Sequence, residues 1–380
     1  MNRTPRLAHV TLLALAMTTV LSCDSLNSSG TVSPQPGPTP DPVSDPASDI
    51  EAMVGQIDTE ADPAFDYAFD QTKFVPPPGQ TLLIMGQTLE AIDAYTASYP
   101  EQPLPGGWAA YWGIPSADGL ATSTVNEFGS THHHQGLVDR FPNAVVQSAL
   151  WMVGTWDVAQ KTAAGDYDPV IREFSAWANS VERPIYLRIG YEFDGPHNEL
   201  EPDEYVAAYR RFVDITRAEG VENVAFVWHS YASTTYNGNP LSAWYPGDDY
   251  VDWVGISLFR HLYAPSLSDE ANAVFEFART HKKPVMVAET SPVLGITSAD
   301  QEVWSAWFVP LFSLAYQKNV KAISFINDDW SVFPPVAALG WSDARLQNNQ
   351  FVSDAWFAET GKDRYLKASP ELFPMLGYTP

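Results

Sequence analysis

The chain has 380 residues, and its 46 acidic against 21 basic side chains give a net charge of −25 at pH 7. A surface of this sign repels nucleic acid and anionic lipid headgroups, and it disfavours a strongly anionic polymer as substrate. The length suits one large domain or two smaller ones.

The first 22 residues have the pattern of an export signal. Arg3 and Arg6 precede an apolar run over residues 10–21, which is too short for a spanning helix of ~20 apolar residues. With Cys23 directly after it, this segment resembles a bacterial lipoprotein signal peptide. Cys23 is then the lipidation site, and the lipid anchors the exported protein to a bacterial membrane, facing the periplasm or the cell surface. The alternative is an ordinary secretory signal beside an incidental cysteine.

Residues 23–78 have the composition of a linker, rich in Pro, Ser and Asp and poor in aliphatic side chains. Such a segment buries too little apolar surface to offset its ordering entropy, and its prolines favour extended conformations. Within it, residues 61–74 carry aromatic side chains that can pack on the domain as an N-terminal arm. Because Cys23 is the only cysteine, no disulfide can form within the chain.

Segments typical of strands and helices alternate through residues 79–380, which indicates a parallel sheet covered by helices. We expect helices at 90–98, 168–181, 202–220, 267–281, 301–318 and 351–359. We expect strands at 81–86, 107–112, 143–151, 183–192, 224–229, 250–257, 284–289 and 320–327. Eight such units predict an α/β fold, a (β/α)₈ TIM barrel in a single catalytic domain. An open doubly wound sheet would instead place a glycine-rich phosphate loop after the first strand, where the sequence reads Met85-Gly-Gln-Thr.

Two glutamates stand at the carboxyl ends of the fourth and seventh expected strands. In the fourth, Arg188, Gly190 and Glu192 share one face because alternate strand residues point the same way. In the seventh, Glu289 follows the apolar run 285–288, where an ionised carboxylate is costly unless it is paired or used. A strand-end glutamate can also simply bind a loop amide. Two at the mouth of one barrel, however, form the carboxylate pair that glycoside hydrolysis requires.

Three stretches resemble glycoside hydrolase family 26, a β-mannanase-like family within the retaining (β/α)₈ glycoside hydrolases. The likeness covers roughly residues 80–360. It implies cleavage of β-glycosidic bonds in a polysaccharide by double displacement, with Glu192 as acid/base and Glu289 as nucleophile. The stretches are Arg188-Ile-Gly-Tyr-Glu192-Phe-Asp-Gly, Trp244-Tyr-Pro-Gly-Asp-Asp-Tyr-Val-Asp-Trp-Val-Gly-Ile-Ser257 and Lys283-Pro-Val-Met-Val-Ala-Glu289-Thr-Ser.

The chain departs from the mannanase pattern at three places. Tyr191 stands where mannanases usually have a histidine, and Pro196-His197-Asn198 replaces a tryptophan-rich run. On the sixth strand, the tyrosine that commonly binds the nucleophile has only Phe259 and Tyr263 as its nearest matches. Retaining chemistry is compatible with these changes, whereas the substrate stays open between mannan, a β-glucan, a xylan such as β-1,3-xylan, and an algal polysaccharide. The three departures are also compatible with an alternative, a non-catalytic surface glycan-binding lipoprotein on a degenerate barrel.

Further residues are expected to bind substrate around the pair. Arg188 can orient a carboxylate or form a core ion pair. His229 is favoured over its neighbour Trp228 to face the mouth, and Trp330 is the expected platform under a sugar ring. Asp194 can bind a sugar hydroxyl, although we favour its capping the next helix. The expected substrate-binding set is Arg188, Tyr191, His229, Trp330, Asp328, Trp112 and Phe259. Tyr111 and Trp112 on the second strand can line distal subsites, although the core suits each of them better.

Three consecutive histidines, His132 to His134, follow the second expected strand. Adjacent imidazoles cannot all reach one metal from a regular strand, and no acid accompanies them at helical or hairpin spacing. We therefore expect a loop that contacts substrate or solvent, with a lyase or a metal-dependent esterase as a remoter alternative. The resulting expectation is a monomer without metal or cofactor, whose partners are a polysaccharide and a membrane lipid and do not include nucleic acid.

Overall fold

The computed structural model describes residues 46–152, 157–233, 238–297 and 301–379. The expected signal peptide, Cys23 and the linker up to residue 45 lie outside the described residues. Among the helices that are described, none is long and apolar enough to cross a membrane.

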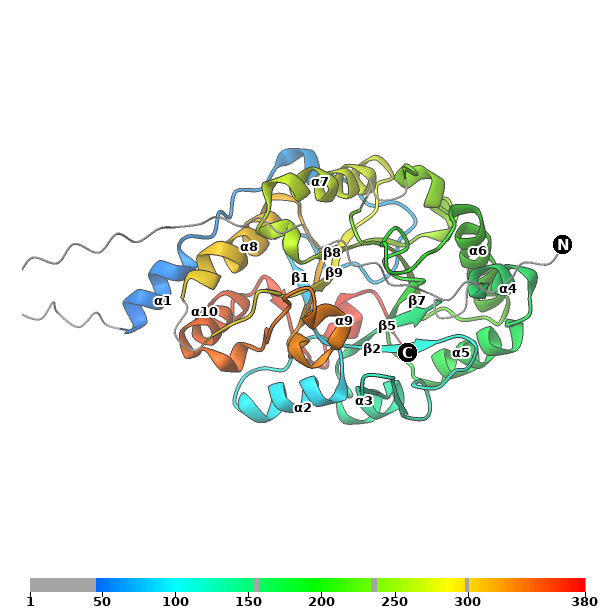
Figure 1. Cartoon of the computed structure of the whole chain (residues 1–380), viewed down its shortest axis with the longest axis horizontal. Coiled ribbons are helices and arrows are strands. Elements are labelled where there is room, and N and C mark those ends of the chain that lie inside the picture. Colours follow the sequence, from blue (N-terminus) through cyan, green and yellow to red (C-terminus); the bar gives the residue numbers. More distant parts are fainter. Residues whose placement is uncertain (1–45, 153–156, 234–237, 298–300, 380) are drawn as a thin grey trace, which may run out of the picture. The chain divides into compact units, whose positions relative to one another are not determined.

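Eight parallel strands close into a barrel, because β10 pairs with β1 as well as with β9 (Figure 1). The (β/α)₈ fold is therefore confirmed, and each barrel strand overlaps one that the sequence predicts. The barrel strands are β1 (Thr81–Gly86), β2 (Gly107–Gly113), β5 (Val145–Trp151), β6 (Ile185–Ile189), β7 (Val224–Ser230), β8 (Trp253–Leu258), β9 (Val285–Thr290) and β10 (Ala322–Ile326). Outside the barrel, β11 (Tyr365–Leu366) pairs with the start of β1, and β3 (Thr124–Val125) with β4 (Thr131–His132) forms a hairpin.

Helices cover the outer face of the barrel. The predicted ones are α2 (Leu89–Ser98), α5 (Asp168–Ser180), α6 (Pro202–Ala218), α7 (Pro265–Thr280), α8 (Val309–Gln317) and α10 (Gln350–Thr360), and a π-helical turn (Trp304–Phe308) leads into α8. The sequence did not predict α1 (Pro46–Val54), α3 (His134–Arg140), α4 (Val158–Ala164), α9 (Pro334–Ala337) and α11 (Leu372–Met375). Short 3₁₀ turns lie at Pro63–Phe65, Leu241–Trp244, Asp248–Tyr250, Arg260–Leu262, Trp330–Val332 and Leu346–Asn348.

Alternation along the strands separates two cores, since a strand in a covered parallel sheet is buried on both faces. Ala225 and Val227 of β7 belong to the core inside the barrel, whereas Phe226 and Trp228 belong to the core between barrel and helices. The same parity sends Tyr111 of β2 inward. It therefore decides which strand-end side chains can reach the mouth.

A bulge in β9 breaks this alternation just before Glu289. On β8, Ile256 pairs with Val287 and the next residue pairs with Glu289, so that Ala288 is the extra residue; the pairing with β10 is irregular at the same place. Val287 packs toward the helices, and regular alternation would send Glu289 the same way. The bulge instead turns its side chain toward the mouth, as bulges near active sites do. Gln147 Nε2 steadies it by donating to the carbonyl of Ala288 at 3.0 Å.

Residues 46–78, which composition assigns to the linker and arm, pack on the barrel. Helix α1 lies beside α10 (Figure 1). Phe65 is buried in the helix-layer core, and Phe74 joins the core inside the barrel. The ammonium of Lys283, which is buried at the start of β9, donates to the carbonyl of Asp70 at 3.0 Å. Apolar side chains and hydrogen bonds to its backbone thus attach this stretch to the barrel and to its helices.

Candidate active site

Glu192 lies in a tight turn that follows β6. The strand ends at Ile189, earlier than predicted, and Gly190 and Glu192 both have φ of +54°. The inference that Glu192 shares a strand face with Arg188 is therefore wrong, although the turn still brings the two side chains to the same mouth. A left-handed conformation costs a non-glycine residue about 1–2 kcal/mol. Asn198 Nδ2 offsets this cost by donating to the carbonyls of Tyr191 and Glu192, at 2.8 Å each.

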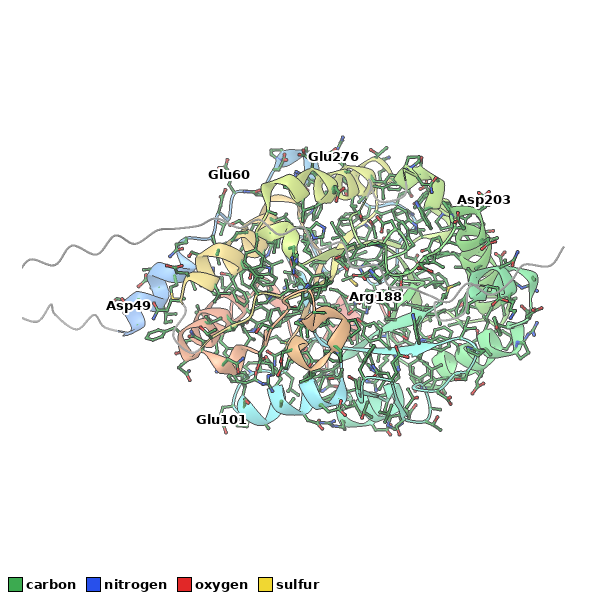
Figure 2. The ribbon with its side chains drawn as sticks, in the orientation of Figure 1. Asp49, Glu60, Glu101, Arg188, Asp203 and Glu276 are labelled. Atoms are coloured by element: carbon green, nitrogen blue, oxygen red, sulfur yellow. The ribbon has the colours of Figure 1, made fainter. Side chains whose placement is uncertain are left out.

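Glu289 is held by two donors from other strands. Its Oε1 accepts from Arg188 Nη1 and from the hydroxyl of Tyr111. Arg188 is fully buried at the centre of the barrel, whereas the labelled acidic side chains lie at the periphery (Figure 2). Burial raises the pKa of Glu289 above its usual value, and the charge of Arg188 limits that rise without reversing it. Because the guanidinium cannot lose its proton, the carboxylate beside it stays ionised as its partner.

Glu192 has different partners. Its Oε2 lies 2.7 Å from Nε2 of His197, and its Oε1 accepts from the hydroxyl of Ser257 at 2.5 Å. Burial raises the pKa of Glu192, but the hydrogen bond and positive charge of His197, together with Ser257, outweigh it and lower the pKa to about 2. The two buried glutamates therefore differ, since one is paired with a permanent cation and the other with a titratable one.

A chain of side chains connects the two glutamates. Arg188 Nη1 lies 3.3 Å from Nδ1 of His229, and Nε2 of His229 lies 2.9 Å from the hydroxyl oxygen of Ser257. Burial and the nearby charge of Arg188 lower the pKa of His229 well below its usual value, so this imidazole is neutral. His229 thus faces the mouth, and its neighbour Trp228 packs against Phe193 in the helix layer.

The other predicted substrate-binding residues lie at varying distances from the glutamates. Tyr191 contacts the ring of Tyr111 edge-on at 5.2 Å and lies under the guanidinium of Arg188. Asp328 accepts from Thr88 at 3.0 Å near the end of β10. Trp112 does not reach the site, because it points outward and stacks on Phe174 with 5.2 Å between ring centroids.

Trp330 and Phe259 belong to an aromatic cluster beside the mouth. Trp330 Nε1 donates to Ser291, two residues after Glu289, at 2.8 Å. Trp330 keeps only 8% of its surface exposed and Phe259 only 3%. Both rings also pack against Trp341. Phe259 therefore serves as packing, and Trp330 can offer a ligand no more than a small part of its ring.

Several contacts of the glutamates escaped the sequence reasoning. Tyr111, from β2, makes the hydrogen bond to Glu289 that was expected from a tyrosine on the sixth strand. Strand alternation could have predicted this, because it points Trp112 outward and Tyr111 inward. Ser257 and His197 carried no recognisable signal. Asp194 was expected to cap the next helix, but Glu201 stands at the start of α6. The carboxylate of Asp194 instead accepts from Ser230 Oγ at 2.7 Å and from the Tyr231 amide at 2.6 Å. These two hydrogen bonds fix the loop after β7.

The three consecutive histidines point in different directions. His132 ends the β3–β4 hairpin, with its ring 5.5 Å from that of Tyr111. His134 opens α3 and is fully buried, bound to the Gly119 carbonyl at 2.7 Å and to Ser148 at 3.0 Å. Within residues 46–379 as far as they are described, no group of three or more His, Cys, Asp or Glu side chains is arranged to hold a metal ion.

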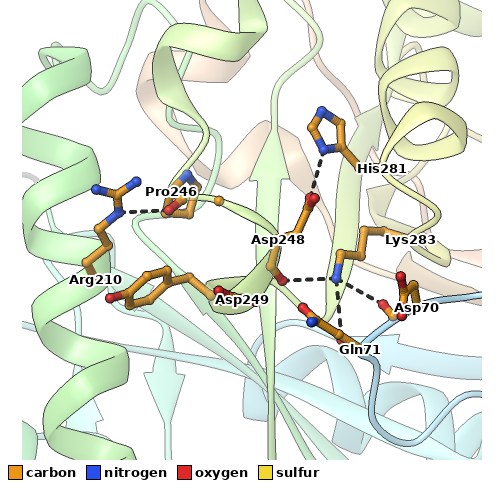
Figure 3. A pocket seen from close by; sticks show the side chains of 10 residues that line it. Asp70, Gln71, Arg210, Pro246, Asp248, Asp249, His281 and Lys283 are labelled. Atoms are coloured by element: carbon orange, nitrogen blue, oxygen red, sulfur yellow. Dashed lines mark hydrogen bonds and ion pairs between the residues drawn. The ribbon is translucent and has the colours of Figure 1, made fainter.

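A cavity of about 420 Å³ lies away from the glutamates, at the opposite end of the barrel (Figure 3). Its lining includes residues 246–250, which precede β8, and Lys283, which precedes β9. Lys283 is bound there to the backbone carbonyls of Asp70, Gln71 and Asp248. This lining anchors the N-terminal arm and includes neither Glu192 nor Glu289.

Comparison with known proteins identifies the family of the chain. Residues 164–331, which include both glutamates, match the model of "Glycosyl hydrolase family 26". The "Beta-1,3-xylanase TXYA" of Vibrio sp. is 30% identical over 334 residues, covering 80% of this chain and 70% of the relative. A "Beta-1,3-xylanase" of Alcaligenes sp. is 29% identical over 334 residues, covering 80% and 68%.

Solved structures share the fold at lower identity. A GH26 β-mannanase from Bacteroides ovatus aligns with a TM-score of 0.55 at 14% identity, over 78% of this chain and 93% of that one. A modular endo-β-1,4-mannanase from Cellulomonas fimi aligns with a TM-score of 0.54 at 14% identity, over 86% and 77%. The match to the family model and the 30% identity to the Vibrio xylanase establish that the chain is a glycoside hydrolase and belongs to glycosyl hydrolase family 26.

Proposed function

We propose that the protein is a retaining endo-β-1,3-xylanase, with Glu289 as nucleophile and Glu192 as acid/base. The observation that carries the mechanism is the unequal setting of the two buried glutamates. Arg188 keeps Glu289 ionised, whereas Glu192 faces the titratable His197. A nucleophile must be charged when it attacks, and an acid/base must gain and lose a proton, so the two settings match these two tasks.

In the first half-reaction, Glu289 attacks the anomeric carbon and a proton from Glu192 reaches the leaving oxygen. In the second, Glu192 removes a proton from water, which displaces Glu289 and restores the starting configuration. Tyr111 and Arg188 stabilise the negative charge of Glu289 before the attack. Their interaction with it weakens as an electron pair of the carboxylate forms the bond to the anomeric carbon. An intact pair with its donors in place favours catalysis over glycan binding alone.

The choice of β-1,3-xylan is supported by the two bacterial relatives with that name, at 30% and 29% identity. The mannanase structures, at 14%, support the fold alone. The net charge of −25 also favours a neutral polysaccharide over an anionic one. Tyr191 and His197, which replace residues usual in mannanases, are consistent with a substrate other than mannan.

The test is hydrolysis of a polysaccharide panel, with β-1,3-xylan, mannan, β-1,3-glucan and β-1,4-xylan at matched concentrations. We expect short β-1,3-linked xylo-oligosaccharides from the first and little product from the others. Proton NMR of the first products reports the anomeric configuration, which we expect to be β. Hydrolysis of mannan alone would overturn the substrate, and an initial α-product would overturn retention.

We also propose that the mature protein is exported and attached to a membrane through a lipid on Cys23. The support is the sequence pattern of residues 1–23 and the proline-rich stretch behind it. Labelling of cells with a radioactive fatty acid should mark the wild-type protein and not the Cys23→Ala variant. Equal labelling, or recovery of the wild type in the soluble fraction, would contradict the anchor.

A further inference from the structure

His197 contacts Glu192 and has no role of its own in either half-reaction of the proposed mechanism. His197 lies five residues after Glu192. Its side chain is 47% exposed, whereas the side chain of Glu192 is 7% exposed. The ring therefore stands between a buried carboxylate and solvent. Any leaving group that approaches Oε2 of Glu192 from solvent has to meet it.

The turn is shaped to admit this ring. A Cβ atom on Gly195 would lie 2.6 Å from Cε1 of His197 and 3.0 Å from the carbonyl oxygen of Glu192. Any larger residue at position 195 would thus push the imidazole away from the carboxylate. On its other side the ring meets Tyr231 edge-on, with centroids 5.2 Å apart. His197 is consequently held in place by packing as well as by its ion pair.

The charged groups around the pair affect the pKa of His197. Burial lowers the pKa of His197, but the hydrogen bond and charge of Glu192 outweigh it and raise the pKa above its usual value. Two further carboxylates, Glu289 and Asp194, act in the same direction. The other titratable or charged groups that face the pair are Arg188 and Tyr191 at the end of β6, His229 and Tyr231 at the end of β7, and His261 after β8.

A general acid needs a proton, yet Glu192 in this arrangement is the charged member of an ion pair. We propose that His197 stores the catalytic proton of Glu192, so that the two side chains carry one proton between them in the resting enzyme. This inference rests on the proposed role of Glu192. It makes His197 a positioning residue, which acts on the substrate only through the carboxyl group.

One proton moves between His197, Glu192 and the substrate during a catalytic cycle. As the leaving sugar oxygen approaches, the N–H bond of His197 Nε2 breaks and an O–H bond forms on Glu192 Oε2. That proton then passes to the glycosidic oxygen, which takes the electron pair of the breaking C–O bond while Glu289 bonds to the anomeric carbon. When water later attacks, its proton returns to Glu192 and from there to His197, and the enzyme is restored.

The first experiment needs no substrate. NMR of the histidine-labelled full chain follows the titration of His197, whose signal is identified by its loss in His197→Gln. We expect the ring to titrate above pH 6.5 in the wild type, and at least ~1 unit lower in Glu192→Gln, because the ion pair supplies the rise. An equal midpoint in both proteins would overturn the shared proton. Because this measurement involves no catalysis, it remains valid even if the proposed substrate is wrong.

The second experiment is the pH profile of kcat/KM on the hydrolysed polysaccharide. Loss of the shared proton sets the basic limb, so His197→Gln should move that limb to lower pH by ~1 unit or more while activity at low pH is largely retained. Gly195→Ala should move it in the same direction by displacing the ring. His281→Gln, which removes a histidine–carboxylate pair at the other end of the barrel, should leave the profile unchanged. Equal loss of activity at every pH would show a structural role only and overturn the proposal.

Discussion

Two histidine–carboxylate pairs of equal length lie at opposite ends of the barrel. At the mouth, His197 is 2.7 Å from Glu192, and at the other end His281 is 2.7 Å from Asp248. The carboxylate at the mouth is 7% exposed and the other is 55% exposed. Water screens the second pair, so the same contact contributes little there. The two pairs have the same distance between their atoms and differ in the burial of the carboxylate. Burial therefore decides which pair can affect catalysis.

The two ends also differ in what surrounds a buried cation. Arg188, at the mouth, is bound to the side chains of Glu289 and His229. Lys283, at the other end, is bound to three backbone carbonyls. Carbonyls cannot change charge with pH, whereas carboxylates and imidazoles can. The charges around Arg188 at the mouth can therefore change with pH. The contacts of Lys283 at the opposite end hold the N-terminal arm in place.

The largest expected effect concerns the glutamates themselves. Glu289→Gln should lower kcat by ~10⁴-fold or more, because the covalent route is lost, and Glu192→Gln by ~10²–10⁴-fold. Asp248→Asn, a carboxylate change at the other end, should leave kcat within a factor of two or so of the wild type. Steady-state kinetics on the hydrolysed polysaccharide measure all three. Wild-type turnover by Glu289→Gln would remove its assignment as nucleophile.

The next effect compares the buried cations. Arg188→Met leaves Glu289 buried without its counter-charge, and breaking such a pair costs about 3–5 kcal/mol of unfolding free energy. Activity should be lost as well. Lys283→Met should also destabilise the fold, because the carbonyls lose their donor, but the remaining folded enzyme should keep its kcat. Denaturant unfolding combined with kinetics separates the two outcomes, and loss of kcat in Lys283→Met would erase the contrast between the ends.

A buried histidine without a carboxylate partner gives the reference case. Burial lowers the pKa of His134 to about 4. Below pH 6.5 the unfolded chain binds a proton there that the folded chain does not, so stability falls as the pH drops from 6.5 to 4. The loss approaches about 3 kcal/mol at 1.36 kcal/mol per pKa unit. The unfolding free energy of His134→Asn should vary less across this range, and a parallel pH dependence in both proteins would contradict the assignment.

The smallest effect belongs to the exposed pair. His281→Gln should change the unfolding free energy by less than about 1 kcal/mol, because Asp248 remains solvated when its partner is removed. Thermal unfolding at pH 6 provides the measurement. A larger loss would mean that this pair supports the arm around Lys283 more than its exposure suggests.

The barrel could be predicted because eight strand-like segments alternate with helix-like ones, and few other folds have that pattern. Both glutamates lie at the mouth as predicted, but neither side chain reaches it through regular strand alternation. Glu192 reaches the mouth through two left-handed residues, and Glu289 through a bulge at Ala288. Neither feature has a period that a sequence pattern can reveal, because each is a local departure from regular strand geometry.

The neighbours of the glutamates were harder to predict for the same reason. Trp112 was expected at the site and Tyr111 in either place, although strand parity sends only Tyr111 inward. His197 and Ser257 become contacts only when a turn and a neighbouring strand converge. Helix α1 lies in a stretch whose composition suggests a linker, and it packs against α10, a contact between distant parts of the chain that composition does not reveal.

The chain from Arg188 to Ser257 has a direction. A guanidinium has no lone pair to offer, so Nδ1 of His229 must accept from it and the ring hydrogen must be on Nε2. That hydrogen points at the oxygen of Ser257, whose own hydrogen is thereby committed to Glu192. One arginine thus fixes the orientation of every hydrogen along the chain. Oε1 of Glu192 is kept as an acceptor, and Oε2 is left as the oxygen through which a proton can be exchanged.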